Sequence, residues 1–308
     1  MTSGACDIVT LVVPVHNRAG LVGDMLASVS MQTALPSVIL VDNNSTDSTY
    51  QVLNRWADGY PAPVKLLKEE TPGATAARNC GLQYVTTPYV MFFDSDDLMA
   101  PNHIERFVEA VKNRKEVDIV GWDIMFNELD GSHRLGKFSA DDMWFRHTFN
   151  AILSTQRYGV RTDLIRKAGG WDVDLPGWND YELGFRLLAQ KPETVKLYGS
   201  PTVTVRRQAE SITGAAYSSA AGRWEKSLQK CCDDVVATGN TWMLPWFRLR
   251  RAVLAAIYYK EGAEDLAKST LKAVLAEVGT RERVLLRTAY HYARRGGRGI
   301  HYLLRPLL

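Results

Sequence analysis

Three carboxylates follow one short apolar segment in the first half of the chain, at Asp94, Asp96 and Asp97. The apolar residues 89–93 before them predict a buried strand. Because side chains alternate in an extended segment, we expect Asp94 and Asp96 on one side and Asp97 on the other. Paired carboxylates suit a hard cation such as Mg²⁺ or Mn²⁺, which proteins hold through one or two carboxylates and substrate phosphates. An acidic turn that caps the next helix is the alternative.

Strand and helix signals alternate before these carboxylates. Apolar, β-branched runs at residues 8–13, 38–41 and 64–67 predict strands, and apolar residues at helical spacing between them predict helices. This alternation favours an α/β fold with a mostly parallel sheet covered on both faces. The loops that close such strands meet at one edge of the sheet, where ligands of open α/β sheets bind.

The chain resembles the inverting glycosyltransferases of family 2, which have the GT-A fold. The resemblance rests on residues 10–17, the turn at residues 41–47, residues 73–81, and the acidic residues 94–97. It implies a nucleotide-diphospho-sugar transferase fold and a nucleotide-sugar donor, preferably a UDP-sugar, that lies across the sheet edge. The base of the nucleotide would lie near Asp42. The diphosphate would lie on Mn²⁺ or Mg²⁺ held by Asp96, with Asp94 on the ribose or sharing the metal.

Two side chains at this edge have roles that also follow from their chemistry. Asp42 can accept a hydrogen bond from the imide N–H of uracil, although a turn-stabilising Asp is the alternative. Arg78 lies on a predicted helix of small residues that can pack closely on the sheet. It is placed to meet a nucleotide or a carboxylate of the site, or it is a solvated surface residue. The donor-binding residues that the resemblance implies are Pro14, His16, Asn17, Asp42, Arg78 and Asp94.

A second acidic segment follows at residues 170–183, where Pro and Gly form a loop and Asp180 begins an amphipathic helix. A carboxylate at a helix start can serve only as a cap. The resemblance implies instead that Asp180 is the catalytic base, which takes the proton of an attacking acceptor hydroxyl. Asn179 stands where many family members carry Glu. Trp178 is a candidate for stacking on a sugar ring, or for anchoring the loop.

Residues 204–213 resemble the family's loop over the diphosphate, in which a His often stands three residues before a Ser. This chain carries Gln208 at that position. Because an amide does not replace imidazole as a good transition-metal ligand, the expected metal site depends more on carboxylates and phosphates. Arg206 and Arg207 are candidates for binding the phosphates, or they are solvated surface residues.

The composition fits an enzyme of this size, since 308 residues with 46% hydrophobic content can bury a large core. We expect a catalytic domain at residues 1–214 and a helical extension at residues 215–308. No segment reaches transmembrane length, the N-terminus lacks a signal-peptide pattern, and the four cysteines lack zinc-site spacing. These features predict a cytoplasmic protein.

Helical spacing continues at residues 246–259, 264–278 and 281–292. The end of the chain carries seven arginines against the single acid Glu282 and finishes in an apolar run. This combination predicts contact with an anionic membrane surface, on the inner face of the cytoplasmic membrane, where a lipid-linked saccharide acceptor would be found. A solvated helix pair is the alternative. The sequence has no recognised nucleic-acid-binding module.

The sequence therefore favours a metal-dependent, inverting glycosyltransferase that acts on a glycan or lipid-linked acceptor in bacterial surface polysaccharide or glycolipid synthesis. A degenerate GT-A domain that binds nucleotide or protein partners without turnover is an alternative, supported by Asn179 and Gln208. A nucleotidyltransferase would normally carry a Gly-rich, basic phosphate loop after the first strand, and residues 14–18 do not resemble one.

Overall fold

The computed structural model describes residues 5–112, 114, 116–207 and 216–307, which fall into two compact units. The first unit comprises residues 1–143, 152–174 and 190–209, and the second comprises residues 144–151, 175–189 and 210–308. The second unit thus includes two segments from the middle of the chain as well as its end. The expected boundary at residues 214 and 215 lies outside the described residues, and that division stays a prediction.

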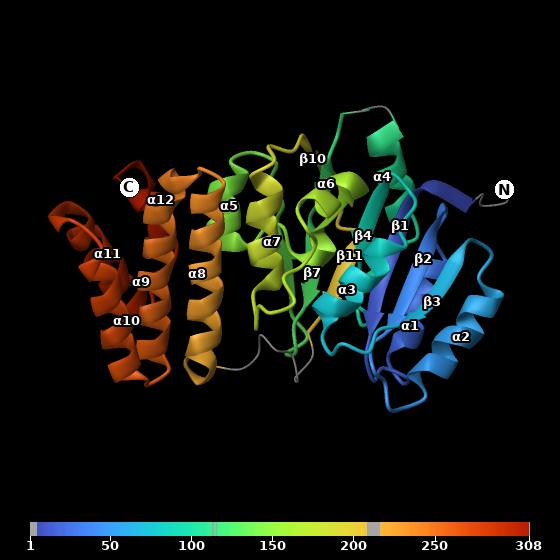
Figure 1. Cartoon of the computed structure of the whole chain (residues 1–308), viewed down its shortest axis with the longest axis horizontal. Coiled ribbons are helices and arrows are strands. Elements are labelled where there is room, and N and C mark those ends of the chain that lie inside the picture. The colour runs from blue at the N-terminus through green and yellow to red at the C-terminus, as the bar shows by residue number, and fades with distance from the viewer. Residues whose placement is uncertain (1–4, 113, 115, 208–215, 308) are drawn as a thin grey trace. The chain divides into compact units, whose positions relative to one another are not determined.

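A seven-stranded sheet forms the centre of the described part of the first unit (Figure 1). β1 pairs in parallel with β2 and β4, and β2 pairs in parallel with β3, which confirms the alternating pattern of the sequence. β9 lies antiparallel between β4 and β6, and β10 pairs in parallel with β6. In spatial order the strands are β10 (Thr194–Leu197), β6 (Ile119–Trp122), β9 (Tyr158–Arg161), β4 (Tyr89–Phe92), β1 (Ala5–Val15), β2 (Leu35–Asp42) and β3 (Val64–Lys68).

The central strand β1 is buried on both faces, since the consecutive residues Leu11, Val12 and Val13 are all fully buried. This is the pattern of a strand that helices cover on both sides. Helix α3 (Ala74–Gln83) approaches the sheet closely at Gly81, where a Cβ atom would lie 2.4 Å from Cγ1 of Val12. The predicted close packing of this helix is therefore confirmed, and it requires glycine at that position.

A smaller four-stranded sheet in the first unit has the order β5, β11, β7, β8. The alternation of apolar runs did not predict it, because its strands are short and mostly half-buried. Its members are β5 (Leu98–Met99), β11 (Val203–Arg206), β7 (Ile124–Asn127) and β8 (His133–Gly136). The other helices described in this unit are α1 (Val22–Ser30), α2 (Thr49–Gly59), α4 (His103–Lys112), α6 (Thr162–Lys167) and the 3-10 turn η1 (Thr155–Arg157).

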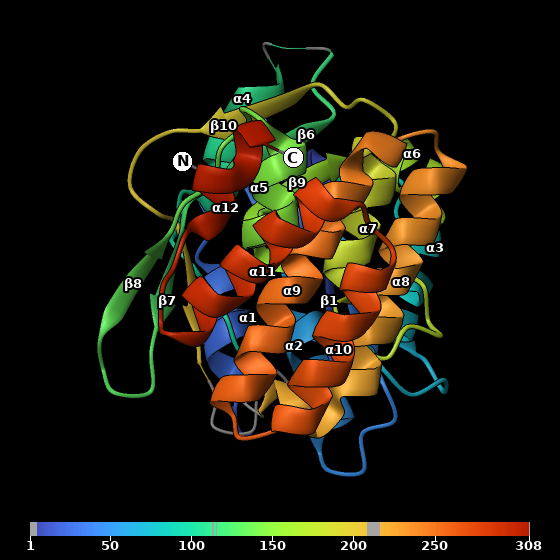
Figure 2. The same ribbon diagram turned by 90° about the vertical axis from the view of Figure 1, so that its left-hand side faces the viewer.

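The second unit is helical in its described residues (Figure 2). The helices expected at residues 246–259, 264–278 and 281–292 are confirmed as α9, α10 and α11, and both α10 and α11 pack on α9. Within the described residues, none of the helices combines the length and the hydropathy that spanning a bilayer requires. The elements are α5 (Met143–Asn150), α7 (Asn179–Leu188), η2 (Tyr217–Ala220), α8 (Ala221–Ala237), η3 (Thr241–Met243), α9 (Leu244–Lys260), α10 (Glu264–Ala276), α11 (Thr280–Arg294), α12 (Ile300–Leu304) and η4 (Arg305–Leu307).

Candidate functional site

The loops after β1 and β2 are joined by hydrogen bonds at the carboxyl edge of the large sheet. Asn17, whose φ of 48° is left-handed, accepts a 2.8 Å bond at Oδ1 from the backbone N–H of Thr46. The Nδ1 atom of His16 lies 2.6 Å from the carbonyl oxygen of Asn43 and can donate to it. Both side chains are exposed, whereas Pro14 is buried within β1. The structure thus places His16 and Asn17 at the predicted edge, and Pro14 beneath it.

Asn43 ties this edge to the loop after β3. Its amide nitrogen donates to the carbonyl oxygens of Glu69 and Thr71, both at 2.8 Å, and its Oδ1 accepts from the N–H of Gly73 at 2.7 Å. The side chain is buried, and three of its bonds end on backbone groups. Asn43 therefore holds two loops together and fixes the start of α3. Sequence reasoning missed this role, although Asn43 belongs to the turn that carries the resemblance.

Asp42 ends β2 and is only 4% exposed. Its Oδ1 atom is buried and has no hydrogen-bond partner within the part of the chain that the structure describes. A buried carboxylate oxygen without a donor costs on the order of 1–3 kcal/mol or more. A ligand that donates an N–H to this atom would offset that cost. The position of Oδ1 therefore suits the predicted recognition of a nucleotide base.

Asp94 is held from two sides. The guanidinium of Arg78 donates to its Oδ1 at 2.7 Å, and the side-chain amide of Gln156, in η1, donates to its Oδ2. Arg78 is buried and lies with its guanidinium carbon 5.6 Å from the ring centroid of Trp171. Arg78 was predicted to contact either a nucleotide or a carboxylate of the site, and in the structure it contacts the carboxylate of Asp94. Gln156 was not predicted, because it lies 62 residues from Asp94 in a segment without a recognisable pattern.

Asp96 and Asp97 differ in burial and in partners. Asp97 is buried, and its Oδ1 accepts a 3.0 Å bond from the backbone N–H of Arg206. Burial, reinforced by the negative charge of Asp94, raises the pKa of Asp97 above its ordinary value. Asp96 is half-buried, and the described residues place no hydrogen-bond donor or cation on its carboxylate. β4 ends at Phe92 and residues 95 and 96 form a turn, so the alternation of side chains expected for an extended segment stays a prediction.

The carboxylate oxygens at this edge fit a divalent cation whose remaining ligands come from a substrate. The described residues contain no group of three His, Cys, Asp or Glu side chains that could bind a metal without further ligands. Asp94 already accepts from Arg78 and Gln156, which leaves Asp96 as the carboxylate available for coordination. Mg²⁺ in particular is often bound by one or two carboxylates together with substrate phosphates.

The two arginines predicted to bind phosphates have acidic partners. Arg206 donates to Oδ2 of Asp24 at 2.7 Å, and its Nε also donates to the carbonyl oxygen of Asp96. Nε of Arg207 lies 3.7 Å from a carboxylate oxygen of Glu128. Each arginine would have to break its ion pair in order to bind a diphosphate. Phosphate binding therefore stays a prediction. Gln208 lies outside the described residues.

The start of α7, in the second unit, is fixed by local hydrogen bonds. Trp178 adopts a left-handed conformation, with φ of 51°, at the helix N-cap, and its carbonyl oxygen accepts from the N–H of Glu182 at 3.0 Å. Asn179 donates from its amide to the carbonyl oxygen of Leu175 at 2.7 Å. Asp180 follows in the first helical turn and is half-buried.

Trp178 packs among aromatic side chains of the second unit. Its ring centroid lies 5.1 Å from that of Trp224 and 6.3 Å from that of Tyr217, and the guanidinium carbon of Arg250 lies 5.1 Å from its centroid. Ser227, on α8, also donates to the carbonyl oxygen of Gly177 at 2.6 Å. These contacts favour the loop-anchoring alternative for Trp178, while its stacking on a sugar stays a prediction.

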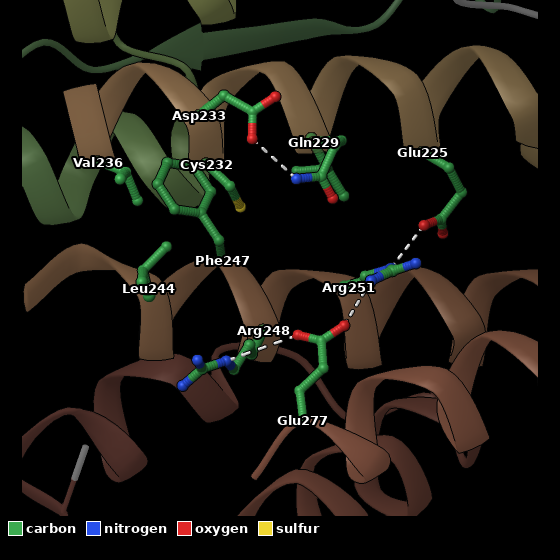
Figure 3. A pocket seen from close by; sticks show the side chains of 11 residues that line it. Glu225, Gln229, Cys232, Asp233, Val236, Leu244, Phe247, Arg248, Arg251 and Glu277 are labelled. Atoms are coloured by element: carbon green, nitrogen blue, oxygen red, sulfur yellow. Dashed lines mark hydrogen bonds and ion pairs between the residues drawn. The ribbon is translucent and has the colours of Figure 1, made fainter. Parts of the chain in front are cut away.

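A pocket on α8, α9 and α10 lies elsewhere in the second unit (Figure 3). Its two arginines are paired with glutamates, while Asp233 accepts from the amide of Gln229. Arg251 donates to Glu225 at 2.5 Å and to Glu277 at 3.2 Å, and Nε of Arg248 lies 3.7 Å from Glu277. These ion pairs connect the three helices, which is a structural role.

Comparisons with known proteins agree with this fold. A family model described as "Glycosyl transferase family 2" matches residues 10–170. The uncharacterized glycosyltransferase YwdF of Bacillus subtilis is 28% identical over 193 residues, which are 61% of this chain and 70% of that protein. The minor teichoic acid biosynthesis protein GgaA of Bacillus subtilis is 29% identical over 133 residues, which are 41% of this chain but only 30% of GgaA.

Solved structures match over almost the whole chain. The structure of Staphylococcus aureus TarS residues 1–349 in complex with UDP has a TM-score of 0.63 at 14% identity, and the match covers 98% of this chain and 92% of that one. The mannosyltransferase PcManGT of Pyrobaculum calidifontis, in complex with GDP-Man and Mn²⁺, has a TM-score of 0.56 at 20% identity, with 96% and 84% covered. These likenesses confirm the predicted α/β fold with a large central sheet, the GT-A fold.

Proposed function

The chain belongs to glycosyl transferase family 2, and we propose that it transfers a sugar from a nucleotide-diphosphate sugar to a hydroxyl of a glycan or of a lipid-linked saccharide. One observation carries the proposal. Asp42 and Asp96 lie at the carboxyl ends of β2 and β4, and β1 pairs in parallel with both strands. Within the described residues, an oxygen of Asp42 and the carboxylate of Asp96 lack donors, whereas Asp94 accepts hydrogen bonds from Arg78 and Gln156.

In this proposal, Asp42 recognises the base of the nucleotide. Its buried Oδ1 would accept the imide N–H of uracil, and the clamp made by Asn43 keeps the surrounding loops in place. TarS, which shares the fold, has been solved with UDP and with UDP-GlcNAc, and this supports a UDP-sugar as the first donor to test. His16 and Asn17, in the loop after β1, are further proposed donor-binding residues.

Asp96 is the proposed protein ligand of Mn²⁺ or Mg²⁺. Such a cation stabilises the negative charge that develops on the leaving diphosphate. Asp94, which Arg78 and Gln156 orient, would contact the ribose through a remaining lone pair of its carboxylate rather than bind the metal. The structure of PcManGT with GDP-Man and Mn²⁺ supports the use of a divalent cation by this fold.

Asp180 is the proposed general base. Its carboxylate would take the proton of the acceptor hydroxyl while the hydroxyl oxygen forms a bond to the anomeric carbon and the bond from that carbon to the diphosphate oxygen breaks. Attack from the face opposite the diphosphate inverts the configuration. Asp180 belongs to the second unit, and the proposed donor-binding residues belong to the first.

The names of two relatives support the proposed acceptor class. GgaA and GgaB of Bacillus subtilis are named as minor teichoic acid biosynthesis proteins, and this supports a role in bacterial surface polysaccharide or glycolipid synthesis. A lipid-linked acceptor would place the enzyme at the cytoplasmic face of a membrane, attached to its surface.

The proposal is tested by calorimetry of UDP, dTDP and GDP with and without Mn²⁺. We expect one nucleotide to bind, with Mn²⁺ strengthening its binding, and Asp96→Asn to remove the effect of the metal. Asp58→Asn, on the exposed side of α2 in the same unit, is the matched control and should bind like the wild type. Failure of all three nucleotides to bind at millimolar concentration would overturn the donor site and favour a degenerate domain.

A further inference from the structure

One face of α11 presents basic and apolar side chains to solvent. Its exposed residues recur at spacings of three and four and therefore form one stripe along the helix. They line a shallow groove in the second unit and are Val284, Arg287, Thr288, His291, Tyr292 and Arg295. Figure 2 shows α11 and the following α12 on the side of this unit that faces the viewer.

The charge of this region differs from that of the rest of the chain. Residues 280–307 contain seven arginines and one acid, a formal charge of +6, whereas the whole chain carries +3, so the remainder carries −3. The single acid, Glu282, pairs with Arg248 of α9 at 3.3 Å. Among the described residues, Arg287 and Arg295 have neither a hydrogen bond nor an ion pair from their side chains, in contrast to the paired Arg248 and Arg251.

Both α11 and the segment that follows it also carry exposed apolar side chains. Val284 lies on the same stripe and is 58% exposed, and Leu303 of α12 is 67% exposed. Tyr302 and Leu307 are also among the exposed large hydrophobic residues. Basic side chains next to exposed aliphatic and aromatic ones are typical of segments that lie in the interface of an anionic bilayer.

We infer that the stripe on α11, with the exposed apolar residues of α12, is a docking surface for an anionic phospholipid bilayer. Arg287 and Arg295 bind the phosphates of the head groups, and Val284 and Leu303 enter the boundary with the acyl chains. Nucleic acid would satisfy the arginines, but it would leave the aliphatic side chains in water. The inference deepens the proposed function, because such a surface brings the enzyme to a lipid-linked acceptor.

Flotation of the full chain with vesicles tests this surface. We expect binding to vesicles of phosphatidylcholine mixed with phosphatidylglycerol and none to phosphatidylcholine alone. Each arginine near an anionic bilayer contributes about fivefold to binding, so Arg287→Gln with Arg295→Gln should weaken the apparent partition about 25-fold. The matched control removes two exposed positive charges of the first unit, Arg55→Gln with Lys112→Gln, and should bind like the wild type.

The apolar contribution is tested by Val284→Ser with Leu303→Ser, for which we expect an about tenfold loss if both side chains are half-buried in the bilayer. Leu129→Ser, which replaces a leucine that is 69% exposed in the first unit, is the control. Equal binding of the arginine variant and the wild type, or binding to a DNA duplex but not to vesicles, would overturn the inference. Asp96→Asn should still bind vesicles, so failure of the donor site and failure of this surface are distinguishable.

Discussion

The sheet edge of the first unit and the start of α7 in the second unit position their polar side chains in different ways. At the sheet edge, amide and guanidinium groups from distant loops hold one another, as Asn43 does with Glu69 and Thr71 and as Arg78 does with Asp94. At α7, local bonds within one turn and aromatic packing around Trp178 set the geometry. The position of a side chain at the sheet edge is therefore fixed by the whole sheet. The position of a side chain at the start of α7 is fixed by one helix and its neighbours.

This difference predicts how each region responds to substitution. Loss of a group at the sheet edge should affect both stability and donor binding, because the same contacts serve both. Loss of Asp180 should affect the reaction rate and leave the fold intact, because a helix start keeps its structure when one carboxylate becomes an amide.

The largest expected effect is that of Asp180→Asn. Removal of a general base typically lowers the rate by 10²- to 10⁴-fold, so we expect turnover about 10³-fold below the wild type with unchanged nucleotide binding. Initial rates with the donor identified by calorimetry measure it. Asp265→Asn, which changes an acidic residue in the first turn of α10, is the matched control and should retain full activity. An Asp180→Asn enzyme with wild-type turnover would contradict the role of the base.

Asn43→Ala tests the clamp at the sheet edge. The variant loses three hydrogen bonds of a buried amide, at about 1 kcal/mol each, so the free energy of unfolding should fall by about 3 kcal/mol. Donor binding should weaken as well, because the loops around Asp42 lose their connection. Chemical denaturation and calorimetry measure the two effects. Asn54→Ala, on the exposed surface of α2, should change neither; a similar small change in both variants would argue against the clamp.

The parts of the site that were predictable from the sequence are those fixed by local patterns. Alternating apolar runs predicted β1 to β4, and the turn after β2 and the acidic residues after β4 predicted the edge where Asp42 and Asp96 lie. The bond from Gln156 to Asp94 was not predictable, because it joins segments 62 residues apart and depends on β9, a short antiparallel strand. The aromatic packing of Trp178 likewise involves Trp224, from a helix that the sequence pattern did not delimit.

His103 gives the first unit a dependence on pH that lies outside the site. Its Nδ1 lies 2.7 Å from Oγ1 of Thr202, and complete burial, with a smaller effect of Arg106, lowers its pKa to about 3. The unfolded chain binds a proton near pH 6.5 and the folded chain does not. Stability should therefore fall as the pH drops from about 6.5 toward 3, by up to about 1.4 kcal/mol per pH unit.

Denaturation of the wild type and of His103→Gln over this pH range measures the effect of His103. The wild type should lose more stability on acidification than the variant, which has no titrating group at this position. His133→Gln, which replaces an exposed histidine of β8, should keep the wild-type slope. If all three proteins have the same slope, His103 does not titrate on unfolding.

The smallest expected effect is that of Arg251→Ala in the second unit. Arg251 joins Glu225 of α8 and Glu277 at the end of α10, and its side chain is 27% exposed. Such partly exposed pairs contribute about 1 kcal/mol, and salt screens them. The variant should thus lose about 1 kcal/mol of unfolding free energy in dilute buffer and less at high salt.

The salt dependence of Arg251→Ala sharpens the comparison between the two regions. The clamp of Asn43 is made of hydrogen bonds from a neutral, buried side chain to backbone groups, so the cost of Asn43→Ala should be the same at low and high salt. Glu225→Gln is a second way to remove one of the ion pairs, and together with Arg251→Ala it forms a double-mutant cycle that isolates the interaction. A cost that is independent of salt for both Arg251→Ala and Asn43→Ala would mean that packing of the Arg251 side chain, rather than its charge, connects α8 with α9 and α10.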